Sequence, residues 1–170
     1  MPTDQTFAIV GAGLAGAKAA ETLREEGFDG RVVMVGAETE APYESPPLSK
    51  GYLLGEAARE DARVHEAGYY EAHDIELREG TSVARLLPGE HAVELADGGS
   101  LAYDRLLLAT GAEPRRPAID GAELDGVHVL RTLGDSDALR AAFEGGGRVV
   151  VIGGGWIGRA SCRERVFRTV

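Results

Sequence analysis

The chain has 170 residues, of which 44 % are hydrophobic, and it carries a formal net charge of -10 at pH 7. It is too apolar to be disordered, and no apolar run approaches the roughly 20 residues that a membrane-spanning helix needs. So acidic a chain also lacks the basic face with which proteins neutralise nucleic-acid phosphates. We therefore expect a soluble, globular protein that binds neither nucleic acid nor membrane.

Cysteine and histidine are sparse. The single cysteine, Cys162, excludes an internal disulfide and a CxxC redox pair within the chain. The N-terminus lacks the basic start and separate apolar stretch of a secretory signal peptide, so we expect a cytoplasmic location. The four histidines have no metal-ligand spacing, and we predict no metal site.

The first 36 residues predict a strand, a helix and a second strand. Residues 7–10 have strand character, and the helix after them carries Leu14, Ala17 and Leu23 on one side before it stops at Gly27. The second strand, "RVVMVG", is apolar throughout, as expected for a parallel strand covered on both faces. This order is typical of a βαβ unit.

A GxGxxG motif, formed by Gly11, Gly13 and Gly16, follows the first strand. In such a loop the first glycine permits a tight turn, the second lets a pyrophosphate approach the backbone, and the third lets the helix pack closely on the strand. Glu38 lies 22 residues after Gly16, just past the second strand, where a carboxylate can bind a ribose hydroxyl. The pattern indicates a dinucleotide site, with a purely structural turn as the alternative.

The next segments predict a proline-rich loop over residues 41–55, a charged helical segment over 56–73 and short strands over 71–87. After them the sequence predicts a hairpin over 92–103, a buried strand over 105–109 and a helix over 135–143. A last strand, "RVVVIG", which we expect to be buried, opens a second glycine loop with Gly153, Gly155 and Gly158. Two such loops predict two nucleotide sites, because FAD and NAD(P) each need a pyrophosphate cradle. The expected fold is α/β and Rossmann-like, with a small antiparallel insertion, and it is truncated.

The loop "PYESPPLSKGYL" contains one of only two lysines, Lys50. Its consecutive prolines stiffen the backbone, and Ser49 is placed to cap a helix that starts near Lys50. Lys50 is either a solvated surface lysine or a fixed cation beside a redox ring whose reduced form is negative. The residues alone leave both interpretations open.

Five segments resemble a known family: "GAGLAGAKAAETLR", "PYESPPLSKGYL", "LLLATGAEPRRP", "VLRTLGDSDAL" and "VVVIGGGWIG". Their order and spacing over residues 7–158 are similar to those of FAD-dependent pyridine nucleotide oxidoreductases of the ferredoxin reductase type, which serve cytochrome P450 and aromatic-ring dioxygenase systems. The resemblance implies an enzyme that passes electrons from NAD(P)H through FAD to a [2Fe-2S] ferredoxin or similar small carrier.

The resemblance also implies roles for single residues. Lys50 would tune the flavin, and Gly153, Gly155 and Gly158 would hold NAD(P)H. The residues expected to bind FAD are Gly11, Gly13, Leu14, Ala15, Gly16, Glu38, Lys50, Val83, Ala109, Thr110, Gly111 and Arg131.

Other functions fit parts of the pattern. A rubredoxin reductase, the flavin component of a nitrite reductase and an NADH oxidase-like flavoprotein share the two-nucleotide layout, and a nucleotide-binding protein without turnover would need only the loops. The chain also departs from the family: Ser45 replaces a frequent arginine, Ala37 a frequent acid, and Ala160 a glutamate that can pair with the lysine.

Residues 159–170 carry four arginines, and their apolar residues fit no helical face. Codons for residues 157–166 can be chosen to match a widely used sequencing adapter. We therefore expect 1–145 to be the N-terminal part of an FAD-binding domain, 146–158 the start of an NAD(P)-binding domain and 159–170 a non-native tail. A variant tail that binds an acidic partner is the alternative. By itself the chain should retain little FAD and show no reductase activity.

Overall fold

The computed structural model describes residues 4–153. This part of the chain forms two units, one made of residues 4–44 and Arg59–Glu113 and the other of Ser45–Ala58 and residues 114–153. None of the helices in the described part is long and apolar enough to cross a membrane.

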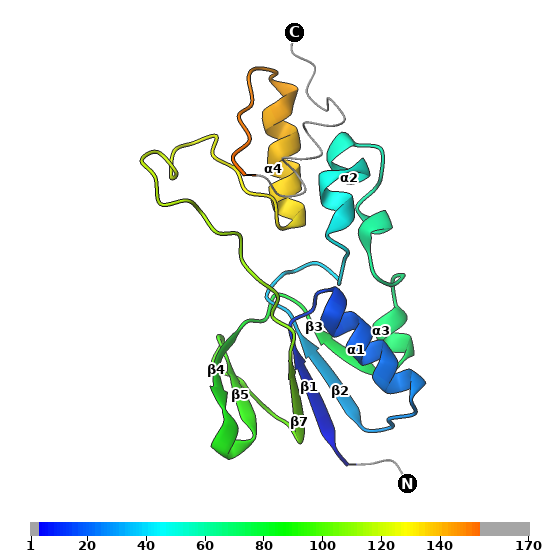
Figure 1. Cartoon of the computed structure of the whole chain (residues 1–170). Coiled ribbons are helices and arrows are strands. Elements are labelled where there is room, and N and C mark those ends of the chain that lie inside the picture. Colours follow the sequence, from blue (N-terminus) through cyan, green and yellow to red (C-terminus); the bar gives the residue numbers. More distant parts are fainter. Residues whose placement is uncertain (1–3, 154–170) are drawn as a thin grey trace. The chain divides into compact units, whose positions relative to one another are not determined.

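A four-stranded parallel sheet with the order β3-β2-β1-β7 is the centre of the first unit (Figure 1). Its strands are β1 (Thr6–Val10), β2 (Arg31–Val35), β3 (Ile75–Arg78) and β7 (Arg105–Leu108). An antiparallel sheet consists of β4 (Val83–Leu87), β5 (Ala92–Leu95) and β6 (Ser100–Ala102). The helical elements are α1 (Leu14–Glu25), η2 (Glu60–Ala62), α3 (Tyr69–Ala72) and η3 (Pro88–Glu90). The predicted α/β fold with an antiparallel insertion is confirmed.

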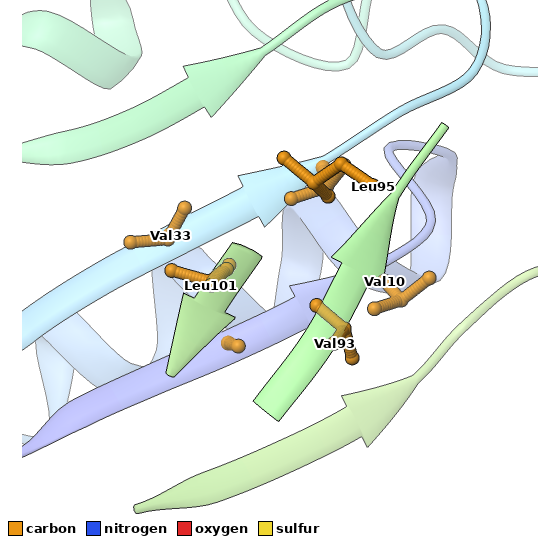
Figure 2. Close-up of a cluster of buried hydrophobic side chains, with 7 residues drawn as sticks. Val10, Val33, Val93, Leu95 and Leu101 are labelled. Carbon is orange, nitrogen blue, oxygen red and sulfur yellow. The ribbon is translucent and has the colours of Figure 1, made fainter. Parts of the chain in front are cut away.

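Side chains that alternate along β1 and β2 build one core on each face of the parallel sheet. On one face they meet β5 and β6 in a cluster formed by Ala8, Val10, Val33, Val35, Val93, Leu95 and Leu101 (Figure 2). On the other face they meet α1 and α3 in a cluster formed by Ile9, Ala17, Ala20, Val32, Met34, Tyr70 and Ile75. The first unit is therefore a three-layer arrangement, with helices on one side of the sheet and the small antiparallel sheet on the other (Figure 1).

The second unit is held together by α4 (Leu133–Glu144), which packs on η1 (Pro46–Ser49) and α2 (Gly51–Leu54). A capping box between Thr132 and Asp135 begins α4. Buried Ser136 donates a hydrogen bond to the carbonyl of Leu48 (2.9 Å), and the Tyr52 hydroxyl donates to Asp137 (2.7 Å). The proline-rich loop is thus fixed by a helix about 90 residues away in the chain, and the predicted helix over 135–143 is confirmed.

The prediction of a helical segment over residues 56–73 is wrong for most of its length. Only the short elements η2 and α3 are helical there. The backbone before α3 instead pairs with the loop after β2, through an antiparallel bridge between Tyr43 and Arg63 and bonds from Glu44 N to Ala62 O and from Val64 N to Pro42 O (both 2.8 Å). These bonds require extended backbone, which a continuous helix cannot supply.

Two predictions about buried strands need correction. Residues 148–152 form no strand, and Val150 is 85 % exposed, because no neighbouring strand pairs with them in the described part of the chain. The strand at 105–109 exists as β7 but is not buried, since β1 is its single partner among the described strands. Leu108 is accordingly 58 % exposed.

A single guanidinium ties the end of α1 to two neighbouring segments. Arg24 donates to the carbonyls of Phe28 (2.6 Å) and Gly30 (2.8 Å) in the turn before β2, and to those of His73 (2.9 Å) and Asp74 (2.6 Å) before β3. No other residue type offers so many donors in one rigid group.

We predict that Arg24→Lys lowers the free energy of unfolding by about 1–3 kcal/mol, because an ammonium cannot satisfy four carbonyls in different directions. Urea denaturation measures the change. The matched control is Arg85→Lys, at an exposed ion pair with Glu94, where we expect almost none. Equal losses of stability in the two variants would contradict the role of Arg24 in joining α1 to the segments before β2 and β3.

His65 is almost buried against the helices of the first unit, with 7 % of its side chain exposed. Its ring stacks on Tyr69 at 3.8 Å between centroids, and its Nε2 has no hydrogen-bond partner in the described part of the chain. Burial lowers the pKa of His65 below its usual 6.5; Lys18 and His73 act in the same direction, and Glu21, 3.9 Å away, acts against them.

The unfolded chain takes up a proton on His65 more readily than the folded chain does. The contribution of neutral His65 to the free energy of unfolding is therefore fully present above about pH 6.5, and it declines as the pH falls toward the lowered pKa of the folded state. We predict that His65→Phe, which keeps an aromatic ring against Tyr69, makes the thermal midpoint less sensitive to pH between 7.5 and 5.5 than in the unsubstituted protein. An unchanged pH slope would show that His65 does not contribute.

Candidate nucleotide-binding site

The first glycine loop lies at the carboxyl edge of the parallel sheet, between β1 and α1. Gly11 N donates to the carbonyl of Val35 at the end of β2 (2.8 Å), and Ala109 N donates to that of Val10 (2.7 Å). The loop is therefore bonded at one end of three adjacent strands. Open α/β sheets bind ligands at this edge.

The three glycines of the loop differ in their surroundings. A methyl group on Gly11, whose φ is +116°, would overlap the Ala109 carbonyl, and one on Gly16 would overlap the Gly11 carbonyl. These two glycines let β7 and α1 approach the end of β1. Gly13 differs, because its φ is an ordinary -92° and a methyl group there would meet nothing within 4 Å. Packing does not explain Gly13, whereas a ligand that approaches the backbone does.

The start of α1 is suited to an anion. The first intrahelical bond runs from Ala17 N to Gly13 O (2.9 Å), so the amides of Leu14, Ala15 and Gly16 have no intrahelical acceptor. The first turn contains no acidic residue and no side chain caps the helix. A helix of 12 residues with this start favours a phosphate group. The open backbone at Gly13 and these donors fit the pyrophosphate of a dinucleotide.

Glu38 lies in the loop after β2, close to the glycine loop. Gly36 packs against Ala12 so closely that a methyl group on it would overlap the Ala12 side chain. The backbone carbonyl of Glu38 accepts from Gly80 N (2.8 Å), and its carboxylate accepts from the Tyr43 hydroxyl (2.5 Å). Sequence reasoning identified Glu38 but missed Tyr43, although "PYESPP" places this tyrosine in the same loop.

Other predicted FAD residues of the first unit lie around the same edge. Ala109 and Thr110 lie against Gly11, while Gly111 is exposed. Val83 begins β4 and is partly buried, just after Thr81, whose N–H donates to the carbonyl of Gly36 (2.7 Å). The first unit thus brings most of the predicted FAD residues to one end of its sheet, and their contacts with a cofactor stay predictions.

Lys50 and Arg131 belong to the second unit. Lys50 is exposed and immediately precedes α2, so the predicted helix start near it is confirmed. The predicted cap is wrong, because the Ser49 hydroxyl is directed to the carbonyl of Pro46 (3.4 Å) and α2 has no side-chain cap. Arg131 donates its backbone N–H to the Asp135 carboxylate (2.9 Å) at the start of α4. The proposed roles of both side chains beside the flavin remain predictions.

The second glycine loop is described only at its beginning. Gly153 has a φ of +120°, and a methyl group on it would meet nothing within 4 Å. Gly155 and Gly158, together with Ala160 and the predicted non-native tail, lie outside the described residues.

Comparisons with known proteins agree on one family. A sequence model of the pyridine nucleotide-disulphide oxidoreductases matches residues 5–162. The chain is 46 % identical over 153 residues to the ferredoxin--NAD(+) reductase component of the biphenyl dioxygenase system of Paraburkholderia xenovorans. The aligned segment covers 90 % of this chain and 37 % of that protein. The chain is 42 % identical over 161 residues to putidaredoxin reductase of Pseudomonas putida, with 93 % and 38 % covered.

Among solved structures, the covalent complex of putidaredoxin reductase with putidaredoxin matches with a TM-score of 0.77 and 38 % identity, over 82 % of this chain and 34 % of that chain. The chain therefore spans less than two fifths of the length of these relatives.

We predict that Gly11→Ala and Gly16→Ala each destabilise the protein by about 2 kcal/mol or more, since both force a backbone overlap and Gly11 also requires a left-handed conformation. Gly13→Ala, in open space with an ordinary φ, should leave the urea midpoint nearly unchanged. A large loss of stability in Gly13→Ala would mean that this glycine serves packing.

Proposed function

The chain belongs to the pyridine nucleotide-disulphide oxidoreductase family, and we propose that its protein is an FAD-dependent NAD(P)H:ferredoxin oxidoreductase. The observation that carries this proposal is the backbone at Gly13, open on the ligand side and placed at the start of α1. Relatives that are 46 % and 42 % identical, named as a ferredoxin--NAD(+) reductase component and a putidaredoxin reductase, support the reaction.

In this proposal the chain's own residues bind and orient two nucleotides. Gly11, Gly13 and Gly16 and the amides of Leu14 and Ala15 hold the FAD pyrophosphate, and Glu38 accepts from the ribose of its adenosine half. When bound, FAD supplies the conversion of two-electron transfer from NAD(P)H into single-electron transfer.

The remaining proposed contacts come from several segments. Val83 and the segment Ala109–Gly111 line the cofactor, and Arg131 binds it. Lys50 provides positive charge that favours the reduced ring. Gly153, Gly155 and Gly158 form the loop for NAD(P)H.

The proposed electron acceptor is a [2Fe-2S] ferredoxin or a similar small carrier that serves a cytochrome P450 or a dioxygenase. Support comes from the relative that was solved as a covalent complex with putidaredoxin. A dithiol relay within this chain is excluded by its single cysteine. We also propose a cytoplasmic location.

The test compares Gly13→Ala with Gly89→Ala, which adds the same methyl group in open space away from the loop. Both variants are made in the parent protein, which is this chain expressed together with its natural downstream sequence. We expect the unsubstituted parent protein to be yellow and to bleach on addition of NADH or NADPH. It should then reduce a [2Fe-2S] ferredoxin. Gly13→Ala should lose at least tenfold in FAD affinity, measured by flavin fluorescence, while the thermal midpoint of the FAD-free protein stays unchanged, and Gly89→Ala should lose no affinity. A colourless parent protein, or equal FAD affinity in both variants, would contradict the proposal.

A further inference from the structure

We propose that Tyr43 is a positioning residue that holds the Glu38 carboxylate toward the ribose of a bound adenine nucleotide, so that the site selects a ribose with its 2′-hydroxyl. The inference rests on the proposed function, because it needs a nucleotide at the first glycine loop. Tyr43 is not part of the GxGxxG pattern, which contributes the glycines and the acidic residue alone.

The contact between the two side chains is short and direct. The Tyr43 hydroxyl donates to Glu38 Oε2 at 2.5 Å, within the range of charge-assisted O–H···O bonds. Glu38 is exposed, and a free glutamate on a loop samples many rotamers. A carboxylate accepts about four hydrogen bonds, so the bond from Tyr43 orients the group and leaves capacity for ribose hydroxyls.

Tyr43 is itself fixed. Its backbone forms the antiparallel bridge with Arg63, and the bonds from Glu44 N to Ala62 O and from Val64 N to Pro42 O lie on either side of it. Pro42, directly before it, is fully buried. A tyrosine on so well anchored a backbone can hold a neighbouring side chain.

The backbone of Glu38 is fixed from the opposite side. Its carbonyl accepts from Gly80 N, and two residues earlier Gly36 packs against Ala12 of the glycine loop and accepts from Thr81 N. The backbone of Glu38 is therefore part of a loop that packs against the glycine loop. Only the side-chain torsions of Glu38 stay free to rotate, and the bond from Tyr43 restricts them. Glu40 of the same loop pairs with Arg59, and Glu38 is the acid that Tyr43 engages.

This geometry favours one class of ligand. An oriented carboxylate accepts well from the vicinal hydroxyls of a ribose, gains less from a 2′-deoxyribose and repels a 2′-phosphate. The first loop should then bind unphosphorylated adenosine dinucleotides. Loss of the Tyr43 hydroxyl should reduce this preference without removing the pyrophosphate cradle.

The experiment titrates the 170-residue chain with ADP and with 2′-deoxy-ADP and follows backbone amides by NMR, which detects millimolar binding. In the unsubstituted chain we expect shifts at the amides of the glycine loop and about three- to tenfold tighter binding of ADP. Tyr43→Phe should reduce this preference, because it should weaken the binding of ADP more than that of 2′-deoxy-ADP. The control Tyr103→Phe removes a hydroxyl elsewhere in the same unit and should change neither affinity.

Glu38→Ala provides a second, independent variant. It removes every acceptor of the side chain and should abolish the preference for ADP, and adding Tyr43→Phe to it should cause no further loss, because the tyrosine acts through the carboxylate. A full preference for ADP in Tyr43→Phe, or additive losses in the double variant, would overturn the role of Tyr43 while the nucleotide site stands. Absence of shifts at the glycine loop with both nucleotides would overturn the proposed function and this inference together.

Discussion

The close approach of α1 to the end of β1 is the constraint on which the rest of the first unit depends. Gly16 has no side chain to separate the helix from the Gly11 carbonyl, and Ala17 and Ala20 continue the same small surface along α1. Small residues at these positions bring the helix axis close to the sheet, where Ile9, Val32 and Met34 fill the space beneath it. The helix start is then held at the strand ends, and its unpaired amides lie at the edge where a ligand can reach them.

The carboxyl edge of the sheet is also tightly bonded. Gly11 N binds the end of β2, Ala109 N binds the end of β1, and the loops after β2 and β3 are joined by the Gly36 and Glu38 carbonyls. Each bond satisfies a backbone group that would otherwise be left at the end of a strand. Loops bonded to each other in this way keep Glu38 and the glycine loop in fixed relation, which a binding site needs before any ligand arrives.

Patterns that depend on neighbours in the sequence predicted the structure well. The βαβ unit, the hairpin of β5 and β6, and α4 follow from apolar periodicity, glycine stops and capping residues, all of which act within a few residues. The roles of Gly11 and Gly16 could also be predicted, because close helix-on-strand packing is built into the motif.

Features set by distant segments could not be predicted from such patterns. Residues 56–73 contain helix-forming residues, but residues 62–64 pair with the loop at Tyr43 and become extended. Apolarity alone made 148–152 and 105–109 look like buried strands, although burial depends on neighbouring strands that a local pattern does not reveal. Tyr43 was missed for the same reason: a tyrosine in a proline-rich loop has no periodicity, and its contact with Glu38 arises only when both ends of the loop are fixed.

The difference between Gly13 and its two neighbours in the motif links fold to function. Gly11 and Gly16 are required by the polypeptide itself, so their presence alone is evidence of a fold and not of a ligand. Gly13 has room for a side chain and an ordinary backbone conformation, so the folded chain gives no reason for glycine at that position. The proposed pyrophosphate of FAD would supply such a reason, and the uncapped start of α1 beside Gly13 suits a phosphate group.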